Sequence, residues 1–149
     1  MQPVETTARR RWMGILAKAP PEAVMSCWSK LDPPPAYELL RRPEIGLVMV
    51  RGRVGGDGAP FNLGEMTVTR CSVRLEDGTV GHAWITGRVG AQAEQAAVLD
   101  AVLQGANVPA GLEADLTRLE AAQATRRSDT AHKAAATRVD FFTMVRGEN

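Results

Sequence analysis

The segment EMTVTRCSVRLEDGTVGHAWITGR, residues 65–88, sets the architecture that we expect for this chain. Residues 65–75 and 80–88 contain many β-branched residues, which strands favour. Between them, EDGT (76–79) is typical of a tight turn. The segment therefore predicts two antiparallel strands joined as a hairpin.

Two further strands are predicted before this hairpin. Residues 36–42 and 46–54 have strand-like patterns, with RRPEIG (41–46) as the turn between them. A longer, glycine-rich connection, GGDGAPFNLG (55–64), then leads to the next strand. Because connections of hairpin length join antiparallel neighbours, residues 36–88 predict a mainly antiparallel, four-stranded sheet.

A helical hairpin is predicted before the sheet, over residues 6–31. Thr6 or Thr7 can cap the first helix, and Pro21 suits the first turn of the second, which DPPP (32–35) ends. Residues spaced three and four apart form an apolar face on each helix. These residues are Trp12, Ile15 and Leu16 in the first helix, and Val24, Cys27, Trp28 and Leu31 in the second.

Helices are also predicted after the sheet, over residues 91–138. The first has an apolar face that can cover the sheet, with Gln92, Asp100 and Gln104 lying elsewhere. The second begins with leucines and continues with alanine as almost its only apolar residue type, so it has little to anchor it to a core and can be an arm. The apolar residues are Val98, Leu99, Val102, Leu103 and Ala106, followed by Leu112, Leu116 and Leu119. The element order predicts one α+β domain over residues 1–149.

Composition narrows the functional class. The chain has 149 residues, of which 44% are hydrophobic and 23% charged, and its net charge is +1, so there is no general attraction to nucleic acid or to a membrane. We expect neither a membrane span nor a secretory signal, and hence a cytoplasmic protein. Cys27 and Cys71 lack CxxC spacing and are expected to be reduced core thiols.

The glycine-rich connection is a candidate for a ligand-proximal loop. Its members are Gly55, Gly56 and Gly58, with Glu65 and Arg70 further along the chain. The pattern is neither a Walker loop nor a dinucleotide fingerprint, so it is either a flexible hairpin loop or a loop that reaches into a partner's ligand site. Asp57 and Glu65 are acids that could act as a base or as a metal-bridging group, although loop carboxylates are usually only solvated.

Other chemistry has weaker support. Two separate histidines, His82 and His132, with two unspaced cysteines do not make a zinc site, so we expect no metal and assign no catalytic residue. Strand arginines could gather an anion or simply solubilise a face, and the basic runs lack interleaved aromatics for nucleic-acid binding. These residues are Arg70, Arg74 and Arg88 on strands, and Arg9, Arg10, Arg11, Arg126 and Arg127 in the runs.

The C-terminal segment RVDFFTMVRGEN, residues 138–149, is unusually apolar for a chain end. Physical chemistry leaves two alternatives open: the segment packs on its own core, or it is buried on another chain. We name residues 139–149 the tail, and its candidate interface residues are Phe141, Phe142, Met144, Val145 and Arg146.

In four segments the chain resembles the PhnG family, the small G subunit of the bacterial carbon-phosphorus lyase core complex. They are RRWMGILAKA (10–19), TRCSVRLEDGTVGHAW (69–84) followed by GR, DAVLQ (100–104) and the C-terminal RVDFFTMVRGEN. The C-terminal segment is the most specific of them. The FNLGE segment (61–65) is less diagnostic of the family.

The resemblance implies an accessory subunit in phosphonate catabolism. In that family the G, H and I subunits, helped by an L protein, replace the adenine of MgATP by methylphosphonate, giving α-D-ribose 1-methylphosphonate 5-triphosphate. The glycosidase-like step is credited to I and the later radical cleavage to the iron-sulfur J subunit. The resemblance thus implies I as the main partner, J and H as further partners, L more remotely, MgATP as substrate of the complex and no cofactor in this chain.

Three other functions remain as alternatives. The chain could be a stand-alone phosphate- or nucleotide-binding domain that uses the glycine-rich loop, a directly catalytic subunit that uses Glu65 or Asp57, or a nucleic-acid binder. In isolation, it could also self-associate through surfaces that are meant for I.

Overall fold

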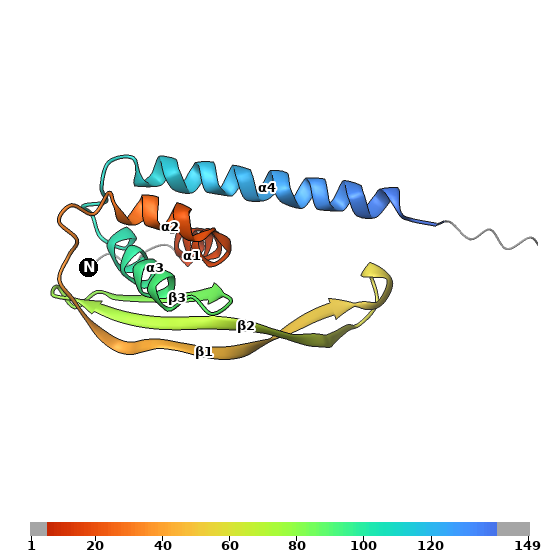
Figure 1. Cartoon of the computed structure of the whole chain (residues 1–149), viewed down its shortest axis with the longest axis horizontal. Helices are drawn as coiled ribbons and strands as arrows, with labels where there is room; N and C mark the ends of the chain where they lie inside the picture. Colours follow the sequence, from red (N-terminus) through yellow and green to blue (C-terminus); the bar gives the residue numbers. More distant parts are fainter. Residues whose placement is uncertain (1–5, 140–149) are drawn as a thin grey trace, which may run out of the picture.

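The computed structural model describes residues 6–139. Helices lie on both sides of a block of strands in the sequence, as expected for an α+β protein (Figure 1). The residues of the tail that were predicted to form an interface lie outside the described residues; they are Phe141, Phe142, Met144, Val145 and Arg146. The elements are α1 (Thr6–Lys18), α2 (Pro21–Trp28), β1 (Tyr37–Arg53), the 3-10 turn η1 (Val54–Gly56), β2 (Pro60–Leu75), β3 (Val80–Thr86), α3 (Gly90–Leu103) and α4 (Leu112–Ala136).

The described part of the chain forms a three-stranded antiparallel sheet in the order β1-β2-β3, so the prediction of four strands was wrong. Residues 41–46 are not a turn, because β1 continues through them as one strand of 17 residues. Pro43 is tolerated there since β1 is an edge strand, and the register shifts on both sides of Arg41 absorb the irregularity.

The predicted connection over residues 55–64 is shorter than expected. β2 already begins at Pro60, so Phe61 to Gly64 belong to a strand and only residues 54–59 connect β1 to β2. The turn between β2 and β3 is confirmed. Gly78 has a φ of +86°, which favours glycine, and the Thr79 N–H donates to Asp77 Oδ1 at 2.8 Å.

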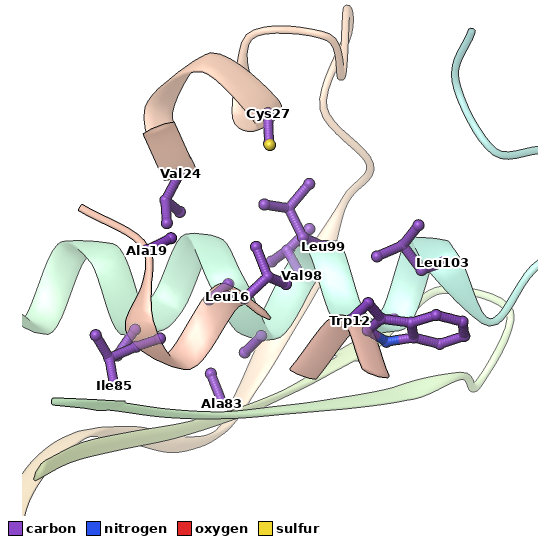
Figure 2. Packing of buried hydrophobic residues seen from close by; sticks show 14 of the residues in the cluster. Trp12, Leu16, Ala19, Val24, Cys27, Ala83, Ile85, Val98, Leu99 and Leu103 are labelled. Carbon is purple, nitrogen blue, oxygen red and sulfur yellow. The ribbon is translucent and has the colours of Figure 1, made fainter. Parts of the chain in front are cut away.

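All four helices lie on one side of the sheet in the view of Figure 1, and α3 packs directly on β2 and β3. Figure 2 shows side chains of α1, α2, β3 and α3 converging in one core. The predicted apolar face of α1 is confirmed, because Trp12, Ile15 and Leu16 are all buried. In α2, Val24 and Cys27 are buried as predicted.

The prediction for α3 was too simple. Of the predicted apolar face Val98, Leu99 and Leu103 are buried, whereas Val102 is half-buried and Ala106 is exposed beyond the end of the helix. The other buried residues of α3 are Gln92, Ala93, Ala96, Ala97, Asp100 and Ala101. The reason is the position of α3 between the sheet on one side and α1 and α2 on the other. A helix that is buried on several sides does not show the one-sided pattern of a surface helix.

The expectation of an arm is confirmed for the second half of α4. Its first turns are anchored, since Leu112 and Leu116 are fully buried and Arg11 of α1 forms ion pairs with Glu113 and Glu120. Every residue from 124 to 136 is exposed. Within residues 6–139 no helix has the combination of length and apolar composition that crossing a membrane requires.

Candidate functional site

The ends of β1 and β2 form a two-stranded ribbon, which we define as residues 46–53, 60–67 and their connection 54–59. β3 pairs with β2 only from Val68 to Arg74, so β2 has a single neighbour, β1, over residues 60–67. The ribbon projects beyond α3 in the same direction as the end of α4 (Figure 1). The ribbon and the α4 arm are therefore the two parts of the described chain that extend farthest from the core.

Large apolar side chains are exposed along the ribbon. The exposed fractions of Leu47, Met49 and Leu63 are 62%, 65% and 66%. By strand alternation Leu47 and Met49 lie on the face of the sheet that α3 covers further along, but beyond the reach of that helix. The other exposed apolar residues of the ribbon are Val50, Val54, Phe61 and Met66. Such a concentration of exposed apolar side chains marks an interaction surface.

The glycines of the predicted loop have a structural explanation. Gly55 and Gly56 have φ values of +64° and +90°, a conformation that residues with a Cβ rarely adopt. At Gly58 a Cβ would lie 2.7 Å from the carbonyl oxygen of Val54, and the Gly58 N–H donates to that oxygen at 3.0 Å. All three glycines are thus required by the tight reversal at the end of the ribbon.

The structure does not bring the ligand-proximal residues together. Asp57 lies in the connection and is exposed. Glu65 lies in β2 opposite Met49, whereas Arg70 lies on the other face of β2 and forms an ion pair with Glu44 at 3.1 Å. A ligand at the glycines would therefore not reach both side chains.

Two of the predicted strand arginines form ion pairs with acids of β1, whereas the third, Arg88, lies beyond the end of β3 at Thr86. Arg74 pairs with Glu38, and Arg41 and Arg70 both pair with Glu44. The hydrogen bond from Arg41 and the charge of Arg70 lower the pKa of Glu44. This arrangement favours a solvated, ion-paired sheet face over an anion site.

The N-terminal basic run is also partly used inside the chain. Arg9 forms an ion pair with Asp100 at 2.7 Å, and Arg11 pairs with two acids of α4. Arg10 between them is exposed and has no hydrogen bond or ion pair to any described residue. The run therefore does not offer three free cations to a nucleic acid.

Sequence reasoning missed the role of Asp100, which is completely buried. Its Oδ1 accepts from Trp12 Nε1 at 2.8 Å and from Arg9 Nε at 3.2 Å, and its Oδ2 accepts from Arg9 Nη2 at 2.7 Å and from the His82 N–H at 2.8 Å. One carboxylate thus ties α1 and β3 to α3. The signal was an aspartate among apolar residues in a helix expected to cover the sheet.

The two histidines lie on different elements. His82 Nδ1 is 2.8 Å from the hydroxyl of Ser72, and His132 is exposed on α4. Within residues 6–139 no group of three or more His, Cys, Asp or Glu side chains could hold a metal ion.

Both thiols are expected to be unreactive in the native protein. Cys27 and Cys71 are free and buried, and burial raises the pKa of both, that of Cys71 to about 11. Because the thiolate is the nucleophile, slow labelling is expected at pH 8, with both thiols reacting once urea unfolds the chain. Iodoacetamide labelling followed by mass spectrometry measures this, and rapid native labelling of either thiol would contradict the packing described.

Comparison with known proteins identifies the family. The family model for the phosphonate metabolism protein PhnG matches residues 7–147. A relative from Rhizobium meliloti (strain 1021), the α-D-ribose 1-methylphosphonate 5-triphosphate synthase subunit PhnG, is 47% identical over 141 residues, which cover 95% of this chain and 90% of the relative. The chain therefore belongs to the PhnG family of phosphonate metabolism proteins.

Proposed function

We propose that this chain is the G subunit of an α-D-ribose 1-methylphosphonate 5-triphosphate synthase, and that it holds a catalytic partner subunit in place without providing reacting groups itself. Membership of the PhnG family and the name of the Rhizobium meliloti relative support the first part. The exposed apolar side chains of the ribbon carry the second part, because a subunit that works by assembly must present such a surface.

The polar groups of the described chain are consistent with an assembly role. Displacing adenine at a ribose carbon requires stabilisation of an oxocarbenium-like centre, and cations for the triphosphate. Arginines of this chain form ion pairs with three of its acids, Glu38, Glu44 and Asp100. The glycine-rich connection, on which a stand-alone nucleotide-binding domain would depend, is explained by backbone geometry.

The finer assignments follow from the family resemblance and are part of the proposal. The I subunit is the main partner, J and H are further members of the core complex, and L acts more remotely. MgATP is a substrate of the complex, this chain holds no cofactor, and the complex works in the cytoplasm. The tail, with Phe141 and Phe142, adds apolar anchors to the surface that the ribbon provides.

A ribbon variant tests the proposal. We expect the triple substitution Leu47→Ser, Met49→Ser and Leu63→Ser to abolish co-purification with the H, I and J subunits and to abolish synthase turnover. Truncating one buried interface anchor costs on the order of 2 kcal/mol, so losing three weakens binding by more than about a hundredfold. Co-expression followed by size-exclusion chromatography measures assembly, and thermal unfolding confirms that the variant is folded.

The matched control is Met25→Ser, because Met25 is 52% exposed but lies on α2, away from the ribbon. This variant should assemble normally. Deleting Phe141 to Asn149 tests the tail in the same assay and is also expected to prevent co-purification. Full assembly and turnover of both the ribbon variant and the truncated protein would exclude the proposed role.

A further inference from the structure

β3 has one edge that does not face another described strand. Along part of this edge, side chains of the same chain form hydrogen bonds with the backbone of β3. Val80 O accepts from Gln104 Nε2 at 2.9 Å and from Arg9 Nη2 at 3.3 Å, and the His82 N–H donates to Asp100 Oδ2 at 2.8 Å. The even-numbered residues of β3 thus direct their backbone polar groups away from β2. In agreement, the odd-numbered Gly87 donates its N–H to Thr67 O of β2 at 2.9 Å.

The next backbone groups along this edge have no hydrogen-bond partner among the described residues. By the same alternation the C=O of His82, the N–H and C=O of Trp84 and the N–H of Thr86 point to the free edge. No described residue provides a hydrogen bond to any of these four groups. An unpaired run of donors and acceptors on an edge strand is a template for another extended chain.

A cavity lies directly beside this unpaired run. Its volume is about 660 Å³, it is open to solvent, and residues of α1, β3 and α3 line it. Apolar groups of Met13, Ala17, Ile85 and Ala96 line it, and Arg10 contributes a cation at its border. The site therefore combines three features. Its backbone donors and acceptors are free to pair with another strand, its apolar cavity can hold side chains, and its cation forms no ion pair with an acid among the described residues.

We propose that the edge of β3 from His82 to Thr86 binds an extended segment of another synthase subunit, which adds a fourth strand to the sheet. The segment places apolar side chains in the cavity and a carboxylate near Arg10. Main-chain hydrogen bonds supply affinity in this mode of recognition, and the pocket beside the strand supplies specificity. The inference rests on the proposed function, since the partner that it names is another subunit of the synthase.

Two observations favour a partner subunit over this chain itself. α4 ends at Ala136, beyond the helices that cover the sheet and away from β3 in the view of Figure 1, so no described residue that follows the sheet lies along this edge. An isologous contact between the β3 edges of two copies would bring two Arg10-bearing helices to one seam, where like charges oppose binding.

The test uses a substitution that blocks the edge without disturbing the existing ladder. Trp84→Pro removes an N–H that points away from β2, so the pairing of β3 with β2 remains. Trp84→Val is the matched control, because it also removes the indole but keeps the N–H. We expect the proline variant to bind the other synthase subunits at least tenfold more weakly than the valine variant, as measured by titration of co-purified partner subunits.

Cross-linking identifies what occupies the edge, even if the proline variant fails to fold. A photo-reactive amino acid in place of the exposed Thr86, introduced into the assembled complex, should cross-link to a segment of another subunit. Cross-links to residues 140–149 of this chain, or to a second copy of it, would overturn the inference. So would equal binding of the folded proline and valine variants.

The outcomes separate this inference from the proposed function. If the parent chain does not co-purify with the other subunits, the proposed function is itself contradicted and this inference falls with it. If the parent complex forms and the folded Trp84→Pro variant joins it equally well, only the edge proposal is overturned.

Discussion

Replacing Gly81 with alanine is expected to prevent stable folding. A Cβ at this position in β3 would lie 1.9 Å from the carbonyl oxygen of Ala97 and 2.8 Å from the backbone nitrogen of Ala101, both in α3. Neither contact can be relieved by rotating a side chain, so α3 would have to move away from the sheet and open the core. We expect a loss of at least about 3 kcal/mol in the free energy of unfolding, at the high end for overpacking.

Gly46→Ala is the matched control for this variant. Gly46 also lies in a strand, but a Cβ there would have no neighbour within 4 Å and its φ is not positive. Its free energy of unfolding should change by less than about 0.5 kcal/mol. Urea denaturation followed by circular dichroism measures both, and equal stability of the two variants would show that α3 does not pack on Gly81.

Asp100→Asn is expected to cause the second large loss. The carboxylate of Asp100 accepts from five N–H groups at once, whereas an amide has one oxygen and turns its NH₂ group toward some of these donors. The charge of Arg9 would also lose its acid. Because Arg9 is 30% exposed, its charge stays partly solvated, and we expect a loss of about 3 kcal/mol.

Asp129→Asn provides the comparison, because Asp129 lies on the exposed part of α4. Its thermal midpoint should remain that of the parent protein, while that of Asp100→Asn should fall by about 10 °C. If both asparagine variants have the same thermal midpoint as the parent protein, the side chain of Asp100 does not hold α1, α3 and β3 together in the way described.

The elements with local signals were predictable. The face formed by Trp12, Ile15 and Leu16 was found from helical spacing, because the first helix has one buried side and one solvated side. The hairpin of residues 65–88 was found because its turn chemistry is local: Gly78 provides the positive φ and Asp77 accepts from Thr79. Each of these features depends on residues that are close together in the sequence.

The errors arose where distant segments decide the outcome. Pro43 indicated a turn, but it lies in a strand because β1 is at the edge of the sheet. Asp100 was placed away from the core, although it is buried by partners 18 to 91 residues away in the sequence. For the candidate site, the glycine cluster left a hairpin loop and a ligand-proximal loop as alternatives, and local sequence gave no sign of the exposed apolar ribbon that ends in this tight reversal.

The α+β class, the apolar faces of the N-terminal helices and the turn before β3 follow from local periodicity and backbone preference, which the amino-acid order contains directly. Family membership is likewise a property of that order.

The exposure of Leu47 and Met49 is instead decided by the tertiary structure. Strand alternation places them on the covered face of the sheet, and they are exposed because α3, which begins at Gly90, does not extend over them. The free backbone groups of Trp84 likewise exist because β3 is the last strand. Burial depends on what lies opposite a residue, and only the packing of segments distant in sequence determines that.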